Sequence, residues 1–574
     1  MSLSKGIFVP VIVIALALMA AACGDDDATE PNATDDTPEA TPEATEPAVE
    51  NREQRAGGEV TVHYVDFQSF DPHFSGFTQD IGHQGMVWRG LYDLSKDNEP
   101  EPLMAAGEPQ VSADGLRYTI ALQDDLVWSD GEPLTAEDFV AAIERTCHFA
   151  IAGQYRSLLS NVVGCDAYAD PGNAELSEAE QEEVREAIGV EAADETTLVF
   201  ELQQPQPTFP LILSMWVAWP VPTHIVEHPG DEWPGAEELA FNGPFVVEEY
   251  QPGTQMVLAR NEEYAGRMAL LDRITLRYVD DAETANNAFR TGELDMATAN
   301  VANLAALEDE FPDELVSTPT AATVGLMLNL GVEPLDQEEV RLALAKAIDR
   351  ESLVGVVLQG AHVPTTDWVP AEILDVEPGT MDEAIGFDPE GAQELLAEAG
   401  FPDGEGFPEL EIVVADTGET RTIGEFLQEQ YNEILGIDTT VEVLDGPSRA
   451  ERLTTGDFEL HPGGFAQDYP DPENWLTSLF HSEGSLNFWN CADPEIDALI
   501  DDARYNRDDD ERRELYRQVH ELVVGRVCGI APYHHMAGHY LVSPEIGGAR
   551  ELSDTKNRVL PGDWAVEEWY LIQE

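Results

Sequence analysis

Three histidines near the C-terminus, His534, His535 and His539, form a group whose type and spacing could bind a metal ion. On a helix, positions 535 and 539 would place two imidazoles on one face, which is a common arrangement for zinc ligands. Pro532 precedes the group and Gly538 interrupts it, and both residue types disfavour a helix. We therefore expect no metal ion and no other cofactor.

The usual catalytic motifs are absent from the sequence. It contains no Walker A loop, no GxSxG elbow, no HExxH zinc site and no GxGxxG dinucleotide motif. Carboxylate pairs abound in a chain with 113 acidic residues, so they do not indicate the acid and base of a glycosidase. We expect a protein that is not an enzyme. A secreted, lipid-anchored hydrolase is the alternative, and turnover of a bound peptide or sugar would identify it.

Four cysteines, Cys147, Cys165, Cys491 and Cys528, lie beyond the N-terminal region. An even number suits disulfides in an oxidising compartment, and no CxxC spacing indicates a zinc or redox motif. Four cysteines allow three pairings. We expect 147–165 and 491–528 because each pair is local in sequence; four reduced, buried thiols are the alternative.

A short apolar segment, residues 7–23, ends in the fifth cysteine, Cys23. Lys5 precedes it, and its length is too short to span a bilayer comfortably, so residues 1–22 are expected to be a signal peptide. The small residues before Cys23 resemble a bacterial lipobox. That resemblance implies an acylated Cys23 that anchors the protein to the outer face of the cytoplasmic membrane, at the cell surface or in the periplasm. An ordinary cleaved signal with a chance cysteine is the alternative.

The charge of the chain excludes one class of partner. Acidic residues number 113 and basic residues 29, and the net charge is −84. Residues 23–57 are expected to be the lipidated cysteine followed by a disordered acidic linker, because their Thr-Pro-Glu-Ala repeats cannot bury enough apolar surface to fold. The rest of the chain is also acidic and repels phosphates, so we expect no nucleic acid partner.

Apolar periodicity predicts a mixed α/β protein. Helix starts are indicated at Thr135, Asp336 and Asp388, and a last long helix over about 510–525. Strands are indicated from Glu59 and over 117–122, 196–202, 255–260, 273–279, 324–330 and 409–415. This alternation is too irregular for one doubly wound sheet or a barrel.

Distinctive motifs run along the chain. Residues 114–122 read DGLRYTIAL and residues 128–138 read WSDGEPLTAED; FDP stands at 70–72, NGPF at 242–245, GELD at 292–295, VRLALAKAIDR at 340–350 and GFAQDYPDP at 464–472. Together they resemble family 5 of the extracytoplasmic solute-binding proteins, which are receptors of ABC importers for di- and oligopeptides. The resemblance covers roughly residues 59–545.

This resemblance implies an α/β fold with two lobes, the Venus-flytrap form of the type II periplasmic binding proteins, with an extra small subdomain and mixed sheets. It places lobe I at 58–94, 199–275 and 535–574, the small subdomain at 95–198 and lobe II at 276–534. A ligand would close the lobes by binding the closed state more tightly. The implied partners of this monomer are a peptide or other small solute and the permease and ATPase subunits of an importer.

The resemblance also implies ligand contacts. Asp468 matches the aspartate that pairs with a peptide's α-ammonium group, a charge-assisted hydrogen bond that a water-poor cleft strengthens. Gly464, Phe465 and Ala466 are expected to be an extended segment that pairs with the main chain of a peptide. The other expected contacts, for which a core position is the alternative, are Tyr469, Trp475, Trp88, Trp216, Trp219, Asn329 and Tyr533.

One absence bears on the ligand. No Lys or Arg occurs from Glu351 to Thr420, although a dipeptide receptor needs a cation for the free carboxylate of its ligand. Arg156, Arg267 and Arg421 remain as candidates. We therefore expect a longer peptide, a capped peptide or a cationic ligand; an oligosaccharide, a nickel chelate or another small solute is the alternative.

The acidic composition predicts that the protein is adapted to high salt. Like charges repel one another, and added salt shortens the screening length from about 10 Å at about 0.1 M to about 3 Å at about 1 M. We expect the melting temperature, followed by circular dichroism, to rise over this range of sodium chloride. A melting temperature that does not rise would contradict the prediction.

Overall fold

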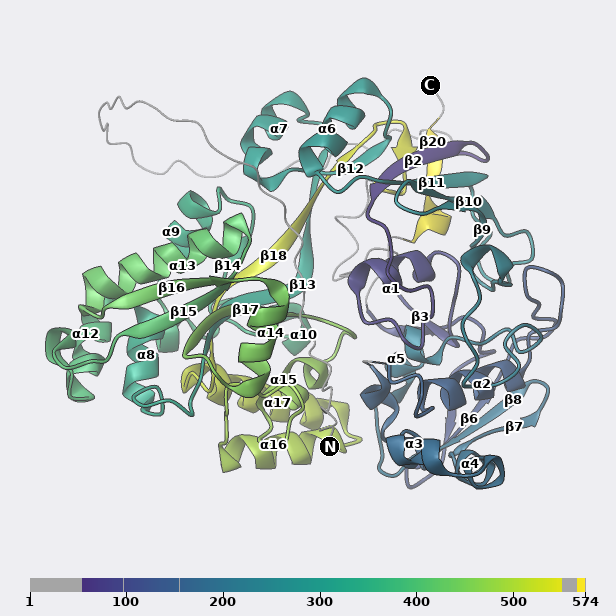
Figure 1. The fold of residues 1–574 in the computed structure, drawn as a ribbon, viewed down its shortest axis with the longest axis horizontal. Helices are drawn as coiled ribbons and strands as arrows, with labels where there is room; N and C mark the ends of the chain where they lie inside the picture. Colours follow the sequence, from purple (N-terminus) through teal and green to yellow (C-terminus); the bar gives the residue numbers. More distant parts are fainter. Residues whose placement is uncertain (1–53, 96–97, 154, 550–564, 573–574) are drawn as a thin grey trace, which may run out of the picture.

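A computed structural model describes residues 54–95, 98–153, 155–549 and 565–572 (Figure 1). Cys23, the expected signal peptide and most of the expected linker lie outside the described residues. Within the described residues, no helix combines the length and the apolar character needed to cross a membrane.

An 11-stranded sheet extends through both halves of the molecule. Its main path runs β16-β15-β17-β13-β18-β12-β2-β11-β10-β9, and β14 pairs with β18. The strands are β2 (Glu59–Tyr64), β9 (Phe245–Gln251), β10 (Gln255–Arg260), β11 (Arg273–Tyr278), β12 (Met296–Thr298), β13 (Leu315–Leu328), β14 (Val363–Pro364), β15 (Leu410–Ala415), β16 (Thr439–Leu444), β17 (Leu460–Ala466) and β18 (Ile530–Val542).

Helices flank the sheet on each side of the molecule, with the helices of one half drawn in green in Figure 1. They are α1 (Thr78–Gly85), α5 (Phe209–Ile212), α6 (Ala282–Thr291), α7 (Leu304–Glu310), α8 (Glu338–Lys346), α9 (Arg350–Ser352), α10 (Ala371–Leu374), α11 (Asp382–Ile385), α12 (Pro389–Glu398), α13 (Gly418–Gln430), α14 (Gly446–Thr455), α15 (Pro472–Phe480), α16 (Pro494–Arg504) and α17 (Asp509–Gly525). A short hairpin adds β3 (Tyr92–Leu94) and β4 (Pro100–Pro102).

Two large hydrophobic cores divide the molecule into two lobes. The first contains Val62, Leu258 and Trp88, all fully buried around β2 and β10. The second contains Val413 and Tyr516, from β15 and α17. Two separate cores are the mark of two domains, and the α/β two-lobed class expected from the sequence is therefore confirmed.

The strands β13 and β18 connect the two lobes. They pair antiparallel, and their register shifts between Pro319 and Thr323. β12 pairs with β2 and places Met296 in the first core, although its residues were expected in lobe II. The chain thus crosses between the cores within β13 and β18, later than the expected crossing near residue 275, because β12 completes the first lobe's part of the sheet.

A separate 4-stranded sheet forms the small subdomain at the lower right of Figure 1. It has the order β5-β6-β8-β7, from β5 (Gln110–Val111), β6 (Arg117–Ala121), β8 (Thr197–Glu201) and β7 (Val190–Asp194), and it lies beside α2 (Ala136–Thr146), α3 (Cys165–Tyr168) and α4 (Glu178–Arg185). A disulfide joins Cys147 to Cys165 here, and a second joins Cys491 to Cys528 beside α17. These are the two local pairs that we expected.

The start of the folded chain is earlier than expected. β1 (Gln54–Arg55) pairs with β20 (Tyr570–Ile572), which also pairs with β19 (Ile546–Gly547). β1 falls in the range 23–57 that we expected to be disordered. Pairing with β20 satisfies its backbone groups, a tertiary contact that the composition of the linker does not reveal.

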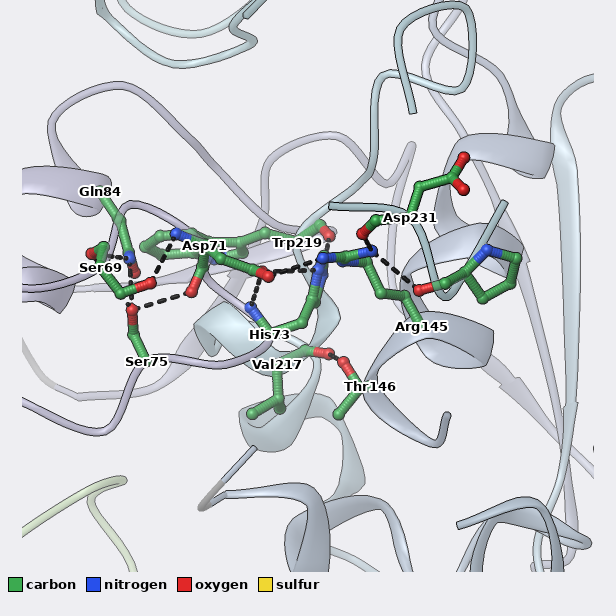
Figure 2. Close-up of polar contacts among 11 residues, drawn as sticks. Ser69, Asp71, His73, Ser75, Gln84, Arg145, Thr146, Val217, Trp219 and Asp231 are labelled. Atoms are coloured by element: carbon green, nitrogen blue, oxygen red, sulfur yellow. Dashed lines mark hydrogen bonds and ion pairs between the residues drawn. The ribbon is translucent and has the colours of Figure 1, made fainter. Parts of the chain in front are cut away.

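A buried ion pair joins the small subdomain to lobe I (Figure 2). Arg145 on α2 donates from one terminal nitrogen to Asp71 at 2.7 Å, and from the other to the carbonyl oxygens of Pro229 and Asp231 at 2.8 Å. Asp71 also accepts from the backbone N–H of His73 at 3.0 Å. Asp71 is the central residue of the FDP motif, whose structural role is to neutralise this arginine.

We expect Asp71→Ala to lower the free energy of unfolding by roughly 3–5 kcal/mol, because it leaves the Arg145 guanidinium buried without a counter-charge. Urea denaturation followed by tryptophan fluorescence measures the change. Arg117→Ala is the matched control: it removes an exposed pair with Glu201, which is worth at most about 1 kcal/mol. Equal losses in the two variants would contradict a special role for the buried pair.

Candidate ligand-binding site

The segment Gly464-Phe465-Ala466 forms the end of β17 and lies in extended conformation. On one side it pairs with β13, with Gly464 opposite Val324 and Ala466 opposite Ala322. A side chain at Gly464 would meet the carbonyl oxygen of Thr323 at 2.6 Å, so glycine permits this close approach of the two strands.

The other edge of β17 is available beyond its first residue. β15 pairs with β17 through Ile412 and Leu460, and no other strand of the described residues pairs with residues 462–466 on that side. Open backbone groups at a strand edge can bind an added strand. The extended segment expected from the sequence therefore has the geometry to pair with a peptide.

A mostly apolar cavity of about 420 Å³ adjoins this edge within lobe II. Its volume lies in the range of small-molecule sites. The walls come from β13, β17, β18, α13 and α14, and include the expected residues Gly464, Phe465, Ala466 and Tyr533. The hydroxyl of Tyr533 is buried and makes no hydrogen bond within the described residues, so it could donate to a bound solute.

Arg449 is a cavity residue that the sequence reasoning missed. It lies on α14, and one terminal nitrogen donates to Nε2 of His461 at 3.2 Å, while Nδ1 of His461 donates to the carbonyl of Val413. Burial, with the nearby arginine, lowers the pKa of His461 to about 3, so this imidazole is neutral. Burial also lowers the pKa of Arg449, and no described carboxylate forms an ion pair with it.

The arginines considered from the sequence have other roles. Arg156 pairs with Asp166, Arg267 with Glu568, and Arg421 with Asp416. Each guanidinium is thus already neutralised by a carboxylate. No local motif marks Arg449, which lies on α14 and reaches the cavity only through the tertiary fold.

Asp468 lies where the two lobes meet. Its carboxylate accepts from the side-chain amide of Asn474 at 3.0 Å and from the hydroxyl of Tyr155 in the small subdomain. Desolvation by burial raises the pKa of Asp468 to about 6, partly offset by these two hydrogen bonds. The residue does not line the cavity, so it defines a second polar position outside it.

Two further expected contacts lie close to this position. Trp216 packs edge-on against Tyr155, with ring centroids 4.8 Å apart. Tyr469 is 5% exposed and packs with the core of lobe I. Both residues thus belong to the junction of the lobes rather than to the cavity.

The remaining expected contacts lie in the interior. Trp88 and Trp475 are fully buried, and the ring of Trp475 packs against the ring of Phe465. Asn329 donates to the carbonyl oxygens of Gly456 and Phe458. Trp219 is 7% exposed and donates its indole N–H to the Ser214 carbonyl. None of these four residues lines the cavity, and their assignment as ligand contacts stays a prediction.

The histidine group lies on a strand, β18, and not on a helix. His535 contacts Thr323 Oγ1 at 2.8 Å, while His539 contacts Ser317 Oγ and the Ala361 carbonyl, also at 2.8 Å. Positions 535 and 539 therefore bind protein groups. His534 instead stacks on the ring of His362, with centroids 4.4 Å apart.

Comparison with known proteins places this geometry in a family. The model of bacterial extracellular solute-binding proteins, family 5, matches residues 99–487. Two lobes joined by paired strands and a cavity at a free strand edge suit a protein that binds a solute. The chain belongs to this family, as the sequence motifs indicated.

Individual relatives span most of the chain. The probable deoxycholate-binding periplasmic protein YgiS of Escherichia coli is 28% identical over 81% of this chain and 84% of that protein. The periplasmic oligopeptide-binding protein OppA of Salmonella typhimurium is 27% identical over 84% of this chain and 88% of its own length. A solved oligopeptide-binding protein of Borrelia burgdorferi superposes with a TM-score of 0.72 at 26% identity, covering 90% of this chain and all of that one (100%).

Proposed function

We propose that this chain is the receptor of an ABC importer, held at the membrane by an acylated Cys23, that binds a peptide between its lobes and delivers it to a permease. Membership of family 5 and the similarity to OppA support this role. The chain would act as a monomer and release its ligand unchanged, with a partner ATPase supplying the energy for import.

The observation that carries the proposal is the free edge of β17 beside an apolar cavity. Residues 462–466 would pair with the peptide main chain, which gives affinity without reading side chains, and the cavity would accept an apolar side chain. Asp468 would bind the peptide's ammonium group and replace the hydrogen bond from Tyr155. A neutral hydroxyl is a weaker partner for a carboxylate than an ammonium group is.

Closure of the lobes would use the strands that join them. The register shift between Pro319 and Thr323 interrupts the β13–β18 ladder and provides a place for bending. Thr208 already donates to Glu473 across the junction at 2.7 Å, and Arg507 donates to the carbonyl of Ala113. A ligand that contacts both lobes would add to these contacts and favour the closed state.

We expect Asp468→Asn to weaken binding of peptides with a free N-terminus by roughly 10- to 100-fold, the loss of one charge-assisted hydrogen bond. For the unsubstituted protein, affinity should fall below about pH 6 by up to tenfold per pH unit, because the ligand-free carboxyl must lose its proton before it can bind the cation. Isothermal titration calorimetry across a set of peptide lengths measures both effects.

Asp502→Asn is the matched control, since it removes the same charge from an exposed position. Its affinity and pH profile should equal those of the unsubstituted protein. Unchanged peptide affinity in Asp468→Asn, or an affinity that is flat from pH 7 to pH 5, would contradict the assignment of Asp468. Failure of every peptide to bind would contradict the proposed ligand class.

A second candidate ligand is an amphipathic carboxylic acid that is not a peptide. The cavity is mostly apolar, and Arg449 offers it a guanidinium without a carboxylate partner. An apolar body with one carboxylate, the chemistry of the deoxycholate named for YgiS, fits this arrangement. A peptide with a free C-terminus presents the same carboxylate, so Arg449 is informative for both ligands.

We expect Arg449→Met to weaken deoxycholate binding by roughly 10- to 100-fold, because the carboxylate loses its counter-charge in a desolvated site. Arg117→Met is the control: it removes an exposed guanidinium that pairs with Glu201 and does not line the cavity. Calorimetry with deoxycholate and with peptides carrying a C-terminal acid or amide measures the effect. Equal affinity in the two variants would contradict the role of Arg449, and no deoxycholate binding in the unsubstituted protein would exclude this ligand.

A further inference from the structure

Three potential metal ligands from distant parts of lobe II meet next to the cavity. One donor atom from each of His362, Glu419 and His534 lies within 4.8 Å of the other two. Nε2 of His362 is 3.7 Å from a carboxylate oxygen of Glu419. Glu419 also lines the cavity, so this group lies at the cavity wall.

The imidazole of His534 lacks hydrogen-bond partners. His534 is completely buried, and neither of its ring nitrogens makes a hydrogen bond within the described residues. Nε2 of His362 is likewise buried without a hydrogen bond. Buried polar atoms in proteins nearly always have a partner, and an unsatisfied group is a sign of a missing water or ion. One nitrogen of each ring lies within 4.8 Å of a Glu419 carboxylate oxygen, so a single bound ion could serve both histidines.

The elements that carry these residues hold them in place. His534 and His535 are neighbours on β18, so their side chains point to opposite faces of the strand, and only His535 reaches Thr323. His362 directly precedes β14, which pairs with β18 so that Pro364 lies opposite His534. Glu419 is in the first turn of α13. Two of the donors thus lie on a strand and a helix, and the third directly precedes a strand that pairs with β18.

We propose that His362, His534 and Glu419 bind one divalent transition metal ion of the zinc, nickel or cobalt class. Two imidazole nitrogens and one carboxylate favour such ions over magnesium and calcium, which prefer oxygen ligands. In a tetrahedral site, ligand atoms lie about 3.4 Å apart. The donors lie within 4.8 Å of one another, so they need to close by at most about 1.4 Å, and the stacked rings of His362 and His534 must also turn toward the ion. Three protein ligands leave a coordination position for water or for a solute in the cavity.

Of the three proposed ligands, only His534 stood out from the sequence, because the other two lie far from it in the chain. The pair at 535 and 539 has the helical spacing of zinc ligands, yet both residues bind protein groups on a strand. The site instead uses His534, which directly precedes His535 on β18, together with His362, which directly precedes β14. Tertiary pairing of β14 with β18 creates it.

The test uses protein without a histidine tag, stripped with a chelator and measured in the absence of any solute. Titration calorimetry with zinc, nickel or cobalt would be done in high sodium chloride with excess magnesium, which occupies the acidic surface with a hard ion. We expect one site per chain. We expect Glu419→Gln and His362→Gln to weaken metal binding by at least tenfold, and His535→Gln to leave it unchanged.

A second readout identifies the ligands. Cobalt bound by two imidazoles and a carboxylate in tetrahedral geometry gives a visible absorption band, which should disappear in His362→Gln. Glu419→Gln is nearly isosteric and partly exposed, so it preserves the fold even where substitution of buried His534 does not. Absence of a magnesium-resistant site, or equal affinity in Glu419→Gln, His362→Gln and His535→Gln, would overturn the proposal. Peptide binding remains measurable in chelator-treated protein. Failure of the metal site and failure of the proposed peptide-receptor function can therefore be told apart.

Discussion

The antiparallel pair of β13 and β18 is the constraint on which the rest of the structure depends. Both strands pass from one core to the other, so they fix the relative position of the lobes and at the same time form walls of the cavity. Thr323 and Tyr533 contribute to that wall, while His534, next along β18, joins the proposed metal site. The register shift after Pro319 lies near the cavity, and bending there would change the lobe angle and the cavity mouth together.

The few arginines of this acidic chain differ in the groups to which they bind. Arg145 forms a buried ion pair with Asp71, and Arg512 forms one with Asp471. The role of these two arginines is structural. Arg341 and Arg350 instead donate to backbone carbonyl groups in the core. Arg449 likewise forms no ion pair among the described residues, but unlike Arg341 and Arg350 it lines the cavity. Arg449 is held by neutral His461, which orients it without cancelling its charge, and this leaves its charge available to a solute anion.

Local signals in the sequence predicted much of the fold. Thr135 begins α2 as expected and forms a capping box with Asp138, because caps depend on a few neighbouring residues. Asp388 likewise begins α12. The site was less predictable. Apolar side chains such as Trp88 suit a core and a pocket equally, and only tertiary packing decides between them.

The two polar positions of the site, Arg449 and Asp468, differ in the contacts that a ligand would have to displace. Arg449 belongs to a cavity built within one lobe, so a carboxylate can reach it without any movement of the lobes. Asp468 already accepts hydrogen bonds from Asn474 and, across the lobe junction, from Tyr155. If a ligand's ammonium group binds Asp468 as proposed, it would compete with Tyr155, and its binding would be coupled to the contact between the lobes. In the proposed mechanism, a ligand that first binds in the cavity would present its cation to Asp468 at high local concentration, so capture in lobe II would be the first step and exchange at the junction the second.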